Sequence, residues 1–149
     1  MGSDGQRDLA VSTFNRVWEL LELPERTVEE TDEMIHAAHV SCYVWSRIGT
    51  PANVARGEWQ CARVYATLGR AEPALWHATR SLELNEAGGE SFEDWDLASA
   101  QQGIAHAHLV SDDQEEARRW AERARASLVR VEDAEDRELI ESQISELGL

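Results

Sequence analysis

The sequence predicts an all-α protein, built as a stack of antiparallel helix hairpins with about seven helices. Three observations lead to this prediction. Apolar residues recur at spacings of three and four along most of the 149-residue chain, which is the period of a helix buried on one side. Capping residues, glycines and prolines divide these stretches at short intervals. Small residues recur in the same order in two stretches, which is typical of a repeat architecture.

We expect one helical domain over residues 7–149, after a disordered segment at residues 1–6. The expected helices cover residues 7–23, 28–48, 51–68, 71–86, 92–110, 113–131 and 134–147. The loops between them are short, and short loops favour antiparallel neighbours.

Local signals delimit the first three helices. Pro24 ends the first, because the residue before a proline avoids the α conformation. Thr27, with a glutamate three residues later, forms a capping box for the second, and Gly49 ends it. Pro51 follows a threonine N-cap and begins the third, which Gly69 ends.

The last four helices are delimited in the same way. Pro73 lies in the first turn of the fourth helix, and a glycine-containing loop at 87–90 follows that helix. Ser91, Asp112 and Asp133 are the expected N-caps of the remaining three, since short polar side chains satisfy the free N–H groups of a first turn. No stretch has the alternating pattern of a strand.

Two stretches of the chain repeat the same order of small residues. Ala62, Ala74, Ala78 and Ser81 recur as Ala105, Ala117, Ala121 and Ala124, 43 residues later. Each stretch reads as a helix, a tight turn and a second helix, and the small residues allow the two helices to approach closely.

The first of these units resembles the tetratricopeptide repeat. Its matching residues are Ala62, Tyr65, Gly69, Ala74, Ala78, Ser81 and Leu82, in the order of the family pattern. The second unit departs from the pattern, with His108 at the tyrosine position and Asp112 at the glycine position. The spacing also exceeds the roughly 34 residues of the family. Residues 7–48 form a helix pair without the signature.

The resemblance implies a binding function rather than a catalytic one. It implies a concave groove lined by the first helix of each unit, in which a protein or peptide is held. The groove positions fall on Arg56, Trp59, Gln60, Arg63, Ser99, Gln102 and His106. Two guanidinium groups beside an indole would suit a partner with an acidic or carboxylate-bearing segment. The alternative is that Trp59 belongs to the core and both arginines pair with nearby glutamates.

Composition narrows the partners. The chain has 29 acidic and 14 basic residues, a net charge of -15, and all 14 basic residues are arginine. So acidic a chain repels nucleic-acid backbones and anionic membranes, and it contains no apolar run of the roughly 20 residues that a membrane-spanning helix needs. The two cysteines form no disulfide framework, so we expect free thiols and a cytoplasmic protein.

A metal site is the main alternative to the peptide-binding prediction. Glutamate, histidine and cysteine recur every third residue in the second helix, through His36, His39 and Cys42. If the second and third helices form a hairpin, Glu58 and Cys61 face them. A mixed site of His39, Cys42, Glu58 and Cys61 would follow, with His36 nearby, although its spacing matches no standard zinc pattern.

No motif of a nucleotide-binding loop or of a catalytic nucleophile occurs in the sequence. We therefore expect no enzymatic activity and no cofactor. Two classes of function remain: an interaction module that binds a peptide or a second copy of the chain, and a metal-binding helical protein. Of the six tryptophans, Trp95 is the one expected at the surface, and most of Trp18, Trp45, Trp76 and Trp120 are expected to fill the core.

Overall fold

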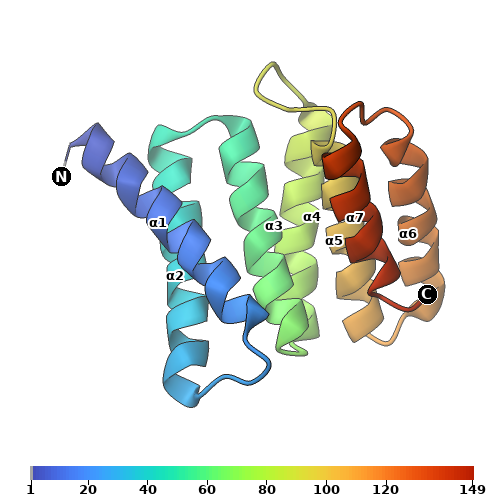
Figure 1. Cartoon of the computed structure of the whole chain (residues 1–149), viewed down its shortest axis with the longest axis horizontal. Helices are drawn as coiled ribbons and strands as arrows, with labels where there is room; N and C mark the ends of the chain where they lie inside the picture. Colours follow the sequence, from blue (N-terminus) through green and yellow to red (C-terminus); the bar gives the residue numbers. More distant parts are fainter. Residues whose placement is uncertain (1) are drawn as a thin grey trace.

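The computed structural model describes residues 2–149 and contains seven α-helices (Figure 1). These are α1 (Ser3–Glu22), α2 (Val28–Ile48), α3 (Pro51–Thr67), α4 (Ala71–Ala87), α5 (Asp96–Val110), α6 (Gln114–Leu128) and α7 (Ala134–Ser145). Residues 2–149 contain no strand, which confirms the all-α prediction. None of the seven helices is both long and apolar enough to cross a membrane.

The helices are arranged as three hairpins and a final single helix. α1 packs on α2, α3 on α4 and α5 on α6, and these are the most extensive contacts in the molecule. The hairpins stack because α3 also contacts α1 and α2, while α5 contacts α3 and α4. Helix α7 contacts both helices of the last hairpin. In Figure 1, α1 crosses in front of α2, and α7 crosses in front of α5.

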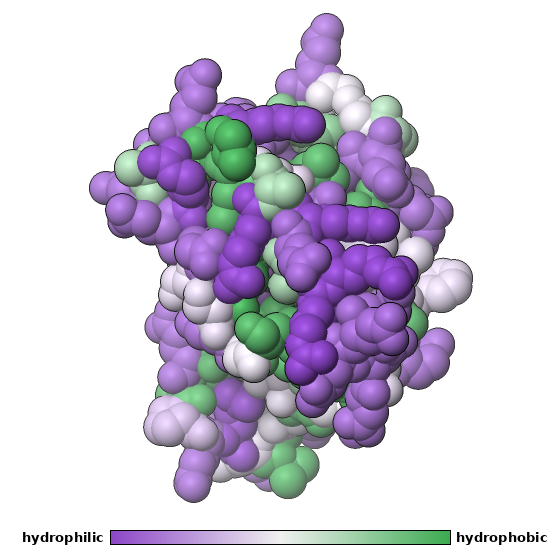
Figure 2. All heavy atoms as spheres, turned by 90° about the vertical axis from the view of Figure 1, so that its right-hand side faces the viewer, coloured by the Kyte–Doolittle hydropathy of each residue, from purple (hydrophilic) through white to green (hydrophobic). Residues whose placement is uncertain are grey.

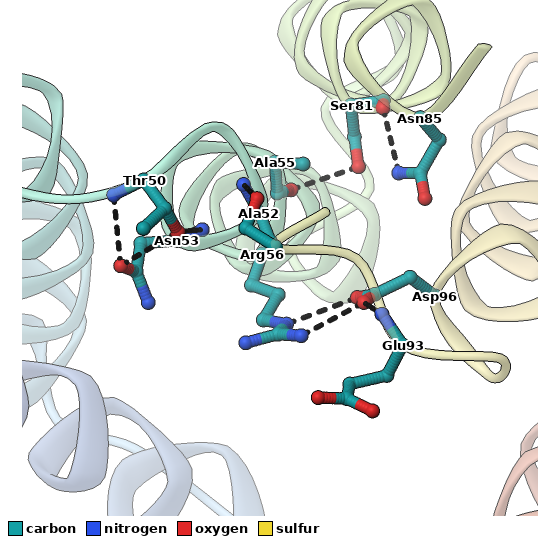
Figure 3. Close-up of polar contacts among 10 residues, drawn as sticks. Thr50, Ala52, Asn53, Ala55, Arg56, Ser81, Asn85, Glu93 and Asp96 are labelled. Atoms are coloured by element: carbon teal, nitrogen blue, oxygen red, sulfur yellow. Dashed lines mark hydrogen bonds and ion pairs between the residues drawn. The ribbon is translucent and has the colours of Figure 1, made fainter. Parts of the chain in front are cut away.

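One buried contact recurs inside the hairpins. The Ser41 hydroxyl donates to the Ala10 carbonyl at 2.8 Å, and the Ser81 hydroxyl donates to the Ala55 carbonyl at the same distance (the second bond is drawn in Figure 3). All four residues are almost completely buried. The helix pair without a sequence signature therefore packs as the second hairpin does.

The corresponding residues of the third hairpin, Ala98 and Ala124, are both fully buried alanines. An alanine needs no hydrogen-bond partner, so apolar contact replaces the serine bond at this position, and the Ser127 hydroxyl joins the two helices elsewhere by donating to Gln101. Small side chains dominate the interior throughout, and 16 of the 30 buried hydrophobic residues are alanines. The close approach expected from the repeated small residues is thus present in the structure.

The ends of three helices differ from the sequence expectations. Helix α1 begins at Ser3, so residues 3–6 are helical rather than disordered, and Met1 lies outside the described residues. The Gly2 carbonyl accepts a hydrogen bond from the Gln6 N–H, and Asp4 lies in the first turn, where a negative charge stabilises a helix. Helix α6 ends at Leu128, and the following turns bury Val131.

The start of α5 is the largest of these differences. The helix begins at Asp96 instead of residue 92, and Ser91 does not cap it. The Ser91 hydroxyl instead accepts a hydrogen bond from the Ala52 N–H of α3. Asp96 accepts from the Glu93 N–H and from Arg56, which holds this turn against α3 (Figure 3). Tertiary bonds therefore replace the local cap.

The packing at Ala74 provides a test of the hairpin register. Ala74 is fully buried among Ala62, Ala66 and Ala78 at the contact of α3 with α4. We expect Ala74→Leu to overpack this contact and lower the free energy of unfolding by roughly 1–3 kcal/mol, measured by urea denaturation. Thr79→Leu, at an exposed position of the same helix, is the control and should change it little. Equal stability of the two variants would contradict the register.

Candidate functional site

The three hairpins present one shared inner face, which we define by equivalent positions on α1, α3 and α5. They are the first, fourth and eighth residues after the buried Ala10, Ala55 and Ala98. On α1 these are Val11, Phe14 and Trp18, on α3 Arg56, Trp59 and Arg63, and on α5 Ser99, Gln102 and His106. Of the residues predicted for the groove, Trp59 and Ser99 line one cavity together with Phe14 and Trp18 of α1, and Arg63 lines the adjoining one.

A cleft lies on this inner face between α1 and α7. It contains a first cavity of about 220 Å³, with walls of Phe14, Trp18, Trp59 and Trp95 on one side and Asp136 and Leu139 of α7 on the other. A second cavity of about 240 Å³ adjoins it, since both are lined by Trp18 and Leu139. The second cavity also contains Arg63. The cleft thus has an aromatic compartment and a charged compartment.

Arg56 does not present a free guanidinium group to this cleft. Its Nε and one terminal nitrogen donate to the two carboxylate oxygens of Asp96 at 2.9 and 2.8 Å (Figure 3). Asp96 is almost completely buried, and the guanidinium group also lies 4.7 Å from the centre of the Trp95 ring. The prediction of two free arginines that hold a carboxylate is therefore wrong for Arg56, which instead joins α3 to the start of α5.

Arg63 is the cation of the second cavity. Its guanidinium carbon lies 5.8 Å from the centre of the Trp18 ring and 5.7 Å from that of Trp59. The Glu146 carboxylate is 3.5 Å away and belongs to an exposed side chain. Burial lowers the pKa of Arg63, and the charge of Glu146 opposes that shift. Glu146 thus already occupies the place where a ligand carboxylate would have to bind.

Two glutamines predicted to bind a ligand are instead buried ties between helices. Gln60 donates from its amide nitrogen to the Phe14 carbonyl of α1 at 3.0 Å. Gln102 donates in the same way to the Gln143 carbonyl of α7 at 3.4 Å. Both side chains are completely buried. Gln60 fixes α1 and Gln102 fixes α7, and these two helices form the sides of the cleft. The two glutamines therefore help to set the width of the cleft.

Trp59 of α3 lines the first cavity. Its side chain is 8% exposed, and its ring centre is 5.6 Å from that of Trp18. A Cβ atom on Gly103 of α5 would come within 2.8 Å of this indole ring. Glycine at that position therefore permits the ring to lie directly against α5.

His106 lies next to Arg63 on the inner face. Burial, and secondarily the positive charge of Arg63, lower the pKa of His106 to about 4. The imidazole is therefore neutral at physiological pH. It contributes a polar but uncharged group behind the charged compartment.

Sequence reasoning missed half of the cleft. Phe14 and Trp18 were expected as apolar helix positions and not as groove residues, because the first hairpin has no signature, although they follow Ala10 at the intervals at which the groove residues follow Ala55. Trp95 is half-buried in the cavity wall, whereas Trp76 of α4, expected in the core, is 61% exposed. Nothing in the local sequence indicated that α7 lies across the inner face.

The residues of the predicted metal site are divided between separate contacts. His39 Nε2 lies 2.8 Å from the Tyr65 hydroxyl, and Nδ1 of His77 donates to Glu58 at 2.6 Å. In residues 2–149, no three histidine, cysteine or acidic side chains are placed to hold a metal ion, and His36 is exposed. The alternative site of His39, Cys42, Glu58 and Cys61 therefore does not assemble.

The two cysteines are buried neighbours with free thiols, as expected. A hydrogen bond with Cys42, together with burial, raises the pKa of the Cys61 thiol well above its ordinary value. A thiol in that state is a poor nucleophile and a poor metal ligand, because both roles require the thiolate.

No protein-family model and no curated protein matches the chain.

The Arg56–Asp96 pair should contribute strongly to stability. Asp96→Ala leaves the Arg56 guanidinium group without its partner and removes the acceptor of the Glu93 N–H. We expect it to lower the free energy of unfolding by roughly 3 kcal/mol, because breaking a buried pair strands the remaining charge. Glu83→Ala, which removes one partner of an exposed pair with Arg80, should cost about 0.5 kcal/mol or less. Similar losses in both variants would show that the Asp96 pair has no special role.

The buried His106 should make the protein sensitive to acid. Its pKa is about 4 in the folded chain, against an ordinary value of 6.5, so the unfolded chain binds the proton first as the pH falls. We expect stability to decline between pH 6.5 and 4, by up to about 3 kcal/mol from this group. His106→Gln should flatten this part of the curve of melting temperature against pH. His36→Gln, at an exposed position, should not, and identical curves for all three proteins would refute the assignment.

Proposed function

We propose that the protein is a non-catalytic interaction module, which binds a peptide segment of another protein in the cleft between α1 and α7. The observation that carries this proposal is the aromatic cavity at the equivalent inner positions of the hairpins, where Phe14, Trp18 and Trp59 come together. The tetratricopeptide-like order of small residues supports the same surface, because that resemblance implies a groove along the first helices of the units.

The size and lining of the cleft support a peptide rather than a metabolite. Each cavity has a volume of about 220–240 Å³, below the range of about 300–1,000 Å³ usual for small-molecule sites. A cavity of this size admits one side chain or head group. Tryptophans are frequent anchors of protein interfaces, and here they stand on helices that are themselves tied together by buried amides.

The charges of the cleft do not favour an acidic partner. The acidic residues that line the two cavities are Glu22, Asp136 and Glu146, against the single cation Arg63. A ligand carboxylate would have to displace Glu146 and approach the other two. We therefore propose that the partner binds through an apolar or cationic segment, and not through the acidic segment expected from the sequence.

Selection from a random peptide display library tests the proposal. Peptides selected on the wild-type protein should bind Leu139→Ser much more weakly, because Leu139 forms a wall of both cavities and is 59% exposed. The loss of one buried leucine contact corresponds to roughly a tenfold decrease in affinity or more, measured by titration calorimetry.

Trp76→Ser is the matched control. Trp76 has a similar exposure, 61%, but lies on α4 outside the cleft. Selected peptides should bind this variant as they bind wild type. Peptides that lose affinity for Trp76→Ser and retain it for Leu139→Ser would place the interaction surface elsewhere and contradict the proposal.

A further inference from the structure

The first cavity of the cleft has an unusual combination of walls. Four aromatic residues line it, Phe14, Trp18, Trp59 and Trp95, and the only charged residue in its lining is Asp136. The face of an aromatic ring is electronegative and attracts cations, most strongly when the ring is that of tryptophan. Three tryptophans and one carboxylate therefore form a wall that suits a positive group.

The Asp136 carboxylate has no internal partner. It is half-buried in the first turn of α7, and no hydrogen bond or ion pair of this side chain occurs among residues 2–149. Asp133, not Asp136, caps the helix with its side chain. The carboxylate therefore lies at the edge of an aromatic cavity, with no cation of residues 2–149 to pair with. A bound cation would supply the missing partner.

The neighbouring arginines do not cancel this preference. Arg56 lies against the Trp95 ring, but Asp96 already neutralises it through two hydrogen bonds. Arg63 lines the second cavity, not the first, and faces Glu146. Both guanidinium groups contact indole rings of this cleft, at 4.7 and 5.7 Å, and so they illustrate the affinity of these rings for cations.

The charge of the whole chain acts in the same direction. With a net charge of -15, the protein attracts cations from solution. Figure 2, which views the end of the stack formed by α6 and α7, shows a mainly hydrophilic surface with small, separate apolar patches. An apolar ligand without charge would gain nothing from this field.

We propose that the first cavity binds an alkylammonium head group, preferentially a quaternary one. A quaternary ammonium has no N–H donors to satisfy, whereas an unmodified lysine would bring three to a lining whose polar side chains are only those of Ser99, Asp136 and Gln143. Two sources have this chemistry: a free choline-type molecule and a trimethylated lysine side chain. The second source rests on the proposed function, since it is a residue of a bound peptide. The cavity of about 220 Å³ is of a size for either head group alone.

NMR of the tryptophan indole N–H groups tests this inference directly. The protein is titrated with choline and with dimethylbutanol, the neutral carbon isostere of choline, at constant ionic strength. We expect choline to shift the signals of Trp18, Trp59 and Trp95 in a saturable way and to leave that of the exposed Trp76 in place. The neutral isostere should bind about tenfold more weakly, because it lacks the cation–π attraction.

Substitution of the carboxylate provides the second measurement. Asp136→Asn keeps the shape of the side chain, and we expect it to weaken choline binding roughly fivefold. Glu138→Gln removes one charge from an exposed position of the same helix outside this cavity, and it should leave the affinity unchanged. Equal binding of choline and its isostere, or equal losses in both variants, would overturn the proposal.

Peptides then distinguish the two sources of the head group. A peptide that carries trimethyllysine should bind more tightly than choline if the partner is a protein, and the unmodified lysine peptide should bind less tightly than the methylated one. Choline binding without any gain from the peptide indicates a free small molecule. If library-selected peptides bind through Leu139 but no ammonium probe binds, the head-group inference fails while the proposed interaction function stands.

Discussion

The close contact of two helices through alanine and serine is the constraint on which the rest of the structure depends. Serine hydroxyls on α2 and α4 reach backbone carbonyls on α1 and α3 at 2.8 Å, and such bonds form only when no larger side chain separates the helices. The buried bond also satisfies the serine, which would otherwise cost free energy in an apolar interior. Because buried small residues recur at the corresponding positions of all three hairpins, α1, α3 and α5 present equivalent positions on one face.

The proposed binding cleft follows from this regularity and from its interruption. Helix α7 contacts α5 and α6 but has no partner helix of its own, so it lies across the inner face instead of extending the stack. Its buried Ile140 and Ile144 fix it there, and Gln102 ties its backbone to α5. The space left between α1 and α7 is the cleft. Aromatic side chains fill the inner positions of α1, and they give the cleft its apolar walls.

Much of the fold could be predicted from the sequence, because helix period, capping and small-residue repeats are local signals. The capping box at Thr27 and the hairpin of α3 and α4 are confirmed. The site was less predictable. Arg56 and Trp59 share a face as their spacing indicates, but the partner of Arg56 comes from Asp96, 40 residues away and expected only as part of a helix. The position of α7 depends on Ile140, Ile144 and the turn at Val131. These residues act through contacts with distant parts of the chain, which the local sequence does not reveal.

The same electrostatic reasoning explains why the cleft differs from the one first expected. An arginine on a groove helix suggests an acidic ligand only if its charge is free. In a chain with 29 acidic residues, a half-buried arginine is paired by its own protein, as Arg56 is by Asp96 and Arg63 by Glu146. Such pairing leaves the carboxylates in excess, and here Asp136 remains beside aromatic rings without a partner in residues 2–149. Because the chain is so acidic, both arginines of this face are paired internally and one carboxylate, that of Asp136, is left over. This excess of negative charge is the reason why we propose a cationic ligand.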